Sequence, residues 1–128
     1  FDDNIGIIWS HPGLKVNDWE NSVSNKNGVV IAGTGLGHIN SELLDIIEKT
    51  SKDIPVAMSS QCLSGSTNLN VYRNGRKLLE RGVVETYDMS PETALVKMMW
   101  LSKHHQENVR TMMGENLVGE ISDSRKLI

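Results

Sequence analysis

The chain has 128 residues, 38% of them hydrophobic and 23% charged, and its 13 Lys and Arg against 16 Asp and Glu give a formal charge of -3 (13 − 16). A length in the range of about 100–150 residues is typical of one compact domain. The mild negative charge disfavours a strongly basic reader of nucleic acid. No apolar run approaches the roughly 18–20 residues of a membrane-spanning helix, and we expect neither such a helix nor a signal peptide. The single cysteine, Cys62, cannot form an internal disulfide, which fits a reducing cytoplasm.

Three short apolar runs are predicted to be buried strands, over residues 5–9, 29–32 and 55–58. Each run is continuously apolar rather than alternating, which is typical of strands covered on both faces in a parallel sheet. A weaker fourth strand is expected over residues 83–85.

Two helices are expected between these strands. Asn40 is a candidate cap for the first, because its side chain can accept a hydrogen bond from a free N–H of the first turn. The second is expected over residues 70–81 and ends at Gly82, since glycine tolerates the conformation that closes a helix. The largely polar segment 14–27 is expected to be a connection. The inward stripe of the first helix consists of Leu43, Ile46 and Ile47.

Two more helices are expected after the last strand. Ser90 and Pro91 form the strongest start signal in the chain, a capping serine followed by a proline at the first helical position. The apolar residues of this helix, whose body spans residues 94–101, wrap much of its surface, which predicts self-association or docking to another domain. The last helix is expected over residues 106–116. Its apolar residues at helical spacing are Val109, Met112, Met113 and Leu117.

Strands that alternate with helices predict parallel crossover units. We therefore expect an α/β fold, a small three-layer domain with a parallel sheet of about four strands and helices on both faces, similar to flavodoxin-like folds.

The loop after the second strand is the most informative feature. Its sequence, Thr34-Gly35-Leu36-Gly37-His38, joins a strand to a helix start, where N–H groups and the helix end favour a negative group. Asn40 stands where a dinucleotide fingerprint needs its third glycine, so a standard dinucleotide site is excluded. The spacing alone leaves two interpretations open, a ligand-facing loop and a tight structural turn.

Other clusters of polar or functional residues can each be interpreted in two ways, as a functional site or as a structural feature. Ser59-Ser60-Gln61-Cys62 leaves a strand end and could line a pocket, although Cys62 lacks a Cys–His motif and is interpreted as a packed side chain. The pair His104-His105 points in two directions and does not predict a metal site. The methionines are expected in the core. A basic face, expected to be mainly solvated, consists of Arg73, Arg76, Lys77 and Arg81.

Several stretches together resemble one known family. Residues 30–39, with the letters VIAGTGLGHI, are similar to the glycine loop in the carboxyl-terminal domain of the asparaginase/glutaminase superfamily. The motif GTGLGH is similar to that of the D-subunit family of archaeal glutamyl-tRNA(Gln) amidotransferases. The same family resemblance extends through residues 58–84, 88–100 and 116–121.

The resemblance implies that residues 1–128 form a carboxyl-terminal domain, and the start at Phe1 is expected to mark an excised domain or a processed product. The catalytic threonines of the family lie in an amino-terminal amidase domain that is absent here, so no catalytic residue is expected in this piece. In relatives this domain of one subunit reaches the active site of its dimer mate, which makes Gly37 and His38 candidate substrate-binding residues.

The family resemblance also implies partners. A protein of this kind releases ammonia from Gln or Asn, and the tRNA-binding E subunit of the amidotransferase uses it to convert Glu-tRNA(Gln) to Gln-tRNA(Gln) with ATP. ATP and magnesium are expected in that partner, with no cofactor or metal bound by this domain, little direct tRNA contact and a cytoplasmic location. Two alternatives stay open: a domain of a free type-I L-asparaginase, and a non-enzymatic small-ligand or interaction module.

Overall fold

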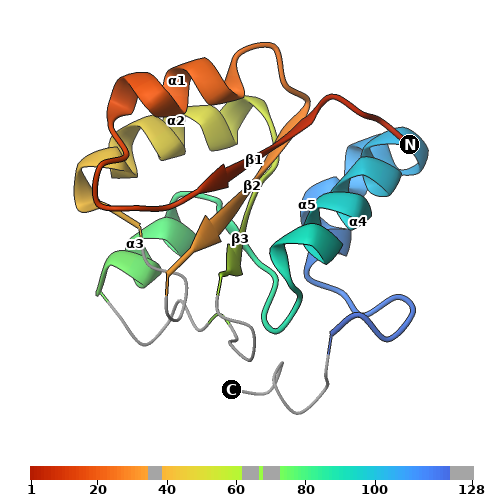
Figure 1. Cartoon of the computed structure of the whole chain (residues 1–128). Helices are drawn as coiled ribbons and strands as arrows, with labels where there is room; N and C mark the ends of the chain where they lie inside the picture. The colour runs from red at the N-terminus through yellow and green to blue at the C-terminus, as the bar shows by residue number, and fades with distance from the viewer. Residues whose placement is uncertain (35–38, 62–66, 68–72, 122–128) are drawn as a thin grey trace.

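The computed structural model describes residues 1–34, 39–61, 67 and 73–121 of the chain (Figure 1). None of the helices within these residues is long and apolar enough to cross a membrane. The elements, in chain order, are β1 (Ile5–Trp9), α1 (Val16–Val23), β2 (Gly28–Gly33), the 3-10 helix η1 (Ser41–Leu43), α2 (Leu44–Asp53), β3 (Val56–Ser60), α3 (Arg73–Glu80), β4 (Val84–Glu85), α4 (Pro91–His104), the 3-10 helix η2 (Gln106–Asn108) and α5 (Val109–Met113).

The four strands form one parallel sheet in the order β1-β2-β3-β4. Trp9 lies opposite Ala32, which lies opposite Ser59, and Gly33 lies opposite Ser60. The carboxyl ends of β1, β2 and β3 therefore meet at one edge of the sheet, the carboxyl edge. Every residue of β2 and β3 is buried, as the apolar runs 29–32 and 55–58 predict, and β3 extends through the polar Ser59 and Ser60. The predicted burial of residues 5–9 is wrong for part of β1, where Trp9 is 45% exposed.

Helices cover both faces of the sheet, which confirms the expected three-layer α/β class (Figure 1). Because side chains alternate along a strand, Val29 and Ile31 of β2 pack toward α1, α2 and α3, whereas Val30 packs toward α4 and α5. The strand order follows the sequence, so right-handed crossovers place all three connecting helices on one face. The fully buried side chains of the two layers include Trp19, Leu43, Ile47 and Met58 on the first face and Met98, Leu101, Met113 and Ile121 on the second.

Helix α1 corrects the expectation that residues 14–27 are only a connection. Most of its side chains are exposed, but Trp19 is completely buried, and its Nε1 donates a hydrogen bond of 2.9 Å to Thr50 Oγ1 of α2. The backbone N–H of Lys15 donates to Asp18 Oδ2 at 2.9 Å, which supports the start of the helix. One buried aromatic residue therefore holds an otherwise polar helix on the domain.

The predicted cap at Asn40 is wrong in its mechanism. Asn40 precedes η1, but its side chain makes no capping hydrogen bond. Its Nδ2 instead donates to the carbonyl oxygens of Leu14 at 3.1 Å and His11 at 3.3 Å. The residue thus fastens the connection after β1 to the segment that leads into α2.

The remaining helix ends follow their local signals with one exception. Ser90 Oγ accepts the N–H of Thr93 at 3.1 Å, as expected for the cap of α4. Gly82 follows α3 with φ of 90°, a conformation that favours glycine. The predicted start of α3 at residues 70–72 lies outside the described residues. The last helix stops at Met113, so Leu117 lies beyond it and is 38% exposed rather than packed on its stripe.

Candidate functional site at the carboxyl edge

The amide of Gln61 ties the strands together at the carboxyl edge. Its Nε2 donates to the carbonyl oxygen of Ser10 at 2.8 Å and also to that of Ala32. The backbone N–H of Gln61 donates to Gly33 O at 2.8 Å, and the N–H of Ser10 donates to Ala32 O at 2.9 Å. These bonds continue the pairing of β1, β2 and β3 by one residue and hold the ends of the three strands together.

The two predicted substrate-binding residues, Gly37 and His38, lie outside the described residues. Their flanks are described. Thr34 follows β2 and is exposed. Asn40 contacts the connection that follows β1. Both flanks of the segment 35–38 therefore lie at the carboxyl edge, where parallel sheets place their ligands.

The hydroxyl groups of Ser59 at the end of β3 and of Thr86 after β4 bond to neighbouring backbone. Ser59 is fully buried, and its Oγ donates to Met89 O at 2.7 Å. Thr86 Oγ1 donates to Met58 O at 2.8 Å on the same strand. The pocket-lining interpretation is therefore wrong for Ser59, while the half-buried Gln61 uses its Nε2 to bond to the strand ends. Cys62 lies outside the described residues.

The basic face of α3 is partly neutralised by α2. Arg81 is half-buried, and its guanidinium lies 3.4 Å from Glu48 Oε2 and 3.9 Å from Asp45 Oδ1. Ion pairs of this kind contribute little stability where one partner is exposed. They reduce the positive field that a nucleic-acid backbone would need.

The histidine pair at the end of α4 packs on an aromatic ring. The ring centroids of His104 and His105 lie 5.1 Å and 5.2 Å from that of Trp100. His104 is exposed and His105 is half-buried. Within the part of the chain that the structure describes, no three His, Cys, Asp or Glu side chains gather as metal ligands would.

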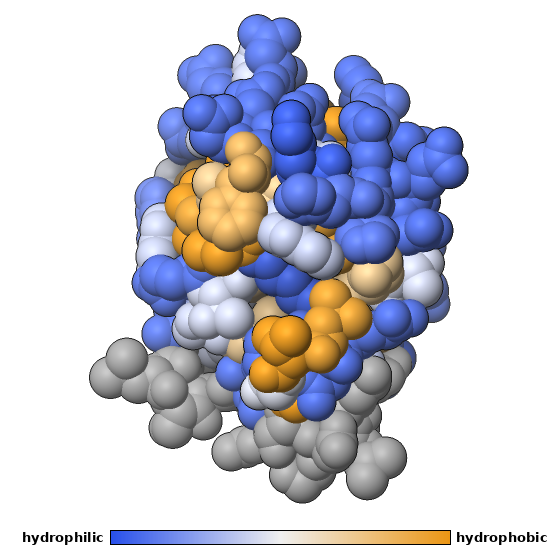
Figure 2. Space-filling view, turned by 90° about the vertical axis from the view of Figure 1, so that its right-hand side faces the viewer, coloured by the Kyte–Doolittle hydropathy of each residue, from blue (hydrophilic) through white to orange (hydrophobic). Residues whose placement is uncertain are grey.

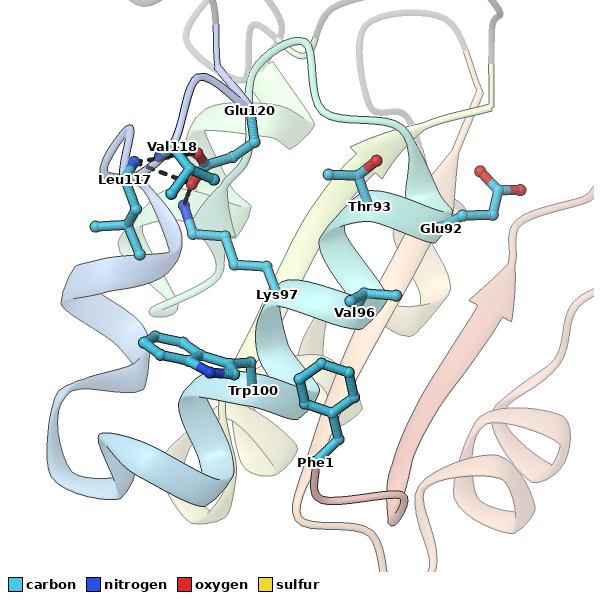
Figure 3. Close-up of a pocket in the computed structure, with 9 residues that line it drawn as sticks. All are labelled: Phe1, Glu92, Thr93, Val96, Lys97, Trp100, Leu117, Val118 and Glu120. Carbon is cyan, nitrogen blue, oxygen red and sulfur yellow. Dashed lines mark hydrogen bonds and ion pairs between the residues drawn. The ribbon is translucent and has the colours of Figure 1, made fainter.

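A second candidate surface lies on the outer side of α4, in the layer opposite α1 and α2. Here an open hollow of about 550 Å³, which we call the α4 groove, separates α4 from the segment after α5 (Figure 3). Figure 2 shows hydrophobic patches on this otherwise mostly polar side of the molecule. The groove is lined by Phe1, Glu92, Thr93, Val96, Lys97, Trp100, Leu117, Val118 and Glu120.

A buried ion pair joins the two walls of the α4 groove. Lys97 Nζ lies 2.6 Å from Glu120 Oε2, and the two side chains are only 6% and 8% exposed. Lys97 Nζ also donates to Met113 O at 3.1 Å and to the carbonyl oxygen of Glu115. Sequence analysis missed this pair, although Lys97 lies at helical spacing with the buried Ala94 and Leu101, where a lysine needs partners.

The same carboxylate shapes the turn at residues 116–121. Glu120 Oε1 accepts the N–H of Val118 at 2.8 Å and that of Leu117 at 3.1 Å. Asn116 Oδ1 accepts the N–H of Gly119 at 2.9 Å, and Gly119 has φ of 93°. The turn is thereby held in one conformation that leaves Val118 91% exposed above the groove.

The contacts of Glu120 predict a dependence of stability on pH. Burial acts to raise the pKa of Glu120, but the hydrogen bonds from Lys97 and from the backbone N–H groups outweigh it and lower the pKa from 4.5 to about 2. A depressed pKa stabilises the fold above the unfolded value, and this stabilisation is lost as the pH falls from about 5 towards 2. The loss amounts to about 3 kcal/mol.

Urea unfolding at a series of pH values measures this loss. Glu120→Gln should lower the free energy of unfolding near pH 7 and flatten its slope between about pH 5 and 2. The exposed Glu115 supplies the control, because Glu115→Gln should leave both unchanged. An acid slope for Glu120→Gln as steep as that of the unchanged chain would contradict the assignment.

The parallel sheet with helices on both faces is that of a known domain class. The model of the "Glutaminase/Asparaginase C-terminal domain" family matches residues 4–113, and the chain belongs to this family.

Among named relatives, the chain is similar to the D subunit of the glutamyl-tRNA(Gln) amidotransferase. It is 44% identical over 132 aligned residues to the protein from Saccharolobus islandicus, an alignment that covers 99% of this chain and 30% of the relative. Identity to the protein from Thermoplasma acidophilum is 45% over 122 residues, covering 94% of this chain and 30% of the relative. The chain thus spans about a third of the length of these relatives.

Solved structures of asparaginases share the fold. The thermostable L-asparaginase from Thermococcus kodakarensis superposes with a TM-score of 0.88 at 35% identity, over 94% of this chain and 38% of that one. L-asparaginase I from Vibrio cholerae gives a TM-score of 0.83 at 32% identity, over 93% of this chain and 38% of that one. The chain therefore spans 38% of each of these solved chains.

Proposed function

We propose that this chain is the carboxyl-terminal domain of the ammonia-releasing subunit of an archaeal tRNA-dependent amidotransferase. The observation that carries the proposal is the 44% identity to the amidotransferase D subunit over 99% of the chain. The motif Gly33-Thr34-Gly35-Leu36-Gly37-His38, which starts at the end of β2, supports the same assignment.

In the full-length protein, a threonine of the amino-terminal amidase domain attacks the side-chain amide of Gln or Asn. Its hydroxyl oxygen bonds to the amide carbon, the carbon–nitrogen bond breaks, and the nitrogen takes up the hydroxyl proton and leaves as ammonia. Water then hydrolyses the acyl-enzyme and restores the hydroxyl. This domain supplies Gly37 and His38, which bind the substrate in the active site of the dimer mate.

The released ammonia passes to the tRNA-binding partner. The whole complex is a ligase, because it forms a new amide bond at the expense of ATP. That partner holds ATP and magnesium and converts Glu-tRNA(Gln) to Gln-tRNA(Gln). The charge of -3 on this domain suits a role with little direct tRNA contact. The complex works in the cytoplasm, and the lone Cys62 fits a reducing compartment.

A free type-I L-asparaginase is the second candidate. The TM-score of 0.88 to the Thermococcus kodakarensis L-asparaginase favours it, because the same fold serves an enzyme described as an L-asparaginase. The two candidates share the amide chemistry and differ in the partner that receives the ammonia.

Ammonia release by the full-length protein tests the proposal. We expect release from glutamine or asparagine by the full-length protein and none above a blank by the chain of residues 1–128. Co-purification with a tRNA-binding partner, and amide transfer to Glu-tRNA(Gln) with ATP, would support the amidotransferase. Asparagine hydrolysis with no such partner would support the free asparaginase. No ammonia from the full-length protein would leave a non-enzymatic module.

A further inference from the structure

We propose that the α4 groove is the surface on which the preceding domain of the full-length protein docks. This inference rests on the proposed function. The groove runs along the outer side of α4, from Glu92 and Thr93 in its first turn to Trp100 (Figure 3).

The first residues of the chain lie along α4 and lead into the groove. The backbone N–H of Asp2 donates to Met99 O at 3.0 Å, and Asp2 Oδ2 accepts the hydroxyl of Ser102 at 2.7 Å. Asn27 Nδ2 donates to the same oxygen at 2.9 Å. These bonds fix Asp2 along α4, and Phe1 lines the groove. Any residue joined to the amino end of Phe1 therefore starts in the groove.

The groove exposes apolar surface that favours burial. The exposed fractions are 70% for Phe1, 49% for Val96 and 91% for Val118. Exposed apolar side chains in a hollow with a polar rim favour an interaction partner, because each square ångström of apolar surface removed from water contributes about 25 cal/mol. Glu92 and Thr93 form part of that polar rim.

The turn at residues 116–121 is already ordered for contact. Glu120 and Asn116 satisfy the N–H groups of the turn, so Val118 and Leu117 are presented without further ordering. Preordering of this kind lowers the entropic cost of docking. The Lys97–Glu120 pair maintains this turn, and each buried charge needs the other because an unpaired buried charge is costly.

The occupant follows from the lengths of the relatives. This chain covers 30% of the amidotransferase relatives and matches a family defined as a carboxyl-terminal domain, so the larger part of such a protein precedes it. A domain tethered at Phe1 has an effective concentration in the millimolar range at the groove, above that of a second copy in free solution. The tethered domain is therefore the favoured occupant.

Cysteine labelling of the full-length protein tests the proposal. Leu117 and Val16 are matched probes, because they are 38% and 37% exposed in this domain, and Leu117 lines the α4 groove whereas Val16 starts α1 on the other face of the sheet. The cysteine of Leu117→Cys should react with a maleimide at least ten-fold more slowly than that of Val16→Cys, at all protein concentrations. Val118→Asp should also speed proteolytic cleavage just before Phe1, whereas Val16→Asp should not.

Equal labelling rates would overturn the proposal. Slow labelling of Leu117→Cys only at concentrations where the protein self-associates would overturn it as well, in favour of a second copy. Ammonia release by the unlabelled protein is measured in parallel. If that activity is absent while the groove is protected, the proposed function fails and the docking surface stands; if activity is present and the groove is open, only the docking surface fails.

Discussion

Lys97→Met is expected to lower the free energy of unfolding by about 3–5 kcal/mol, because it leaves the carboxylate of Glu120 buried without its counter-charge. The two side chains are 6% and 8% exposed, so little water can replace the lost ammonium group. The carbonyl oxygens of Met113 and Glu115 lose a donor in the same step. Urea unfolding near pH 7 measures the change.

Two further variants separate the ion pair from simple loss of a lysine. Lys103→Met is the matched control on the same helix, and its exposed side chain predicts a change within about 0.5 kcal/mol. Lys97→Met combined with Glu120→Gln removes both charges and should recover part of the loss. A Lys97→Met variant as stable as the unchanged chain would contradict the burial of this pair.

Trp19→Ala is expected to cost about 3–5 kcal/mol, since it removes the one completely buried side chain of α1. The indole fills space between α1 and α2, and its Nε1 is a hydrogen-bond donor to Thr50 Oγ1. Loss of the ring leaves both a cavity and an unpaired acceptor. Thermal or urea unfolding measures the change, and hydrogen exchange should show α1 opening first.

Trp9→Ala is the control for the same substitution at an exposed site. Trp9 is 45% exposed at the end of β1, so its truncation should cost clearly less than that of Trp19. Equal losses for the two variants would mean that Trp19 does not anchor α1.

The two central strands could be predicted because β2 and the first part of β3 are continuous apolar runs. Residues of β2 such as Val30 and Ile31 are buried on both faces, which removes the polar alternation that would have confused the pattern. The start of α4 was equally readable, since Ser90 and Pro91 act within one turn of the chain. Helix α1 could not be predicted, because Trp19 is its one buried residue and a single apolar position shows no helical periodicity.

The contacts that the sequence did not predict join residues that are distant in the sequence. Asn40 bonds to carbonyl groups 26 and 29 residues away instead of capping its own helix. Gln61 bonds back to β1 and β2, which no local pattern encodes. Lys97 finds Glu120 across the groove only once α4 and the last turn are packed. Gly37 and His38 stay predictions drawn from the family motif.

The most direct test of the central claim is steady-state ammonia release by the full-length protein carrying His38→Ala. If the segment after β2 completes an amide-hydrolysing site, loss of one hydrogen bond to a charged substrate group should raise KM about ten-fold or more, with a smaller change in kcat. His104→Ala is the control, an exposed histidine at the end of α4. Kinetic constants within about two-fold of those of the unchanged protein for His38→Ala would contradict the account.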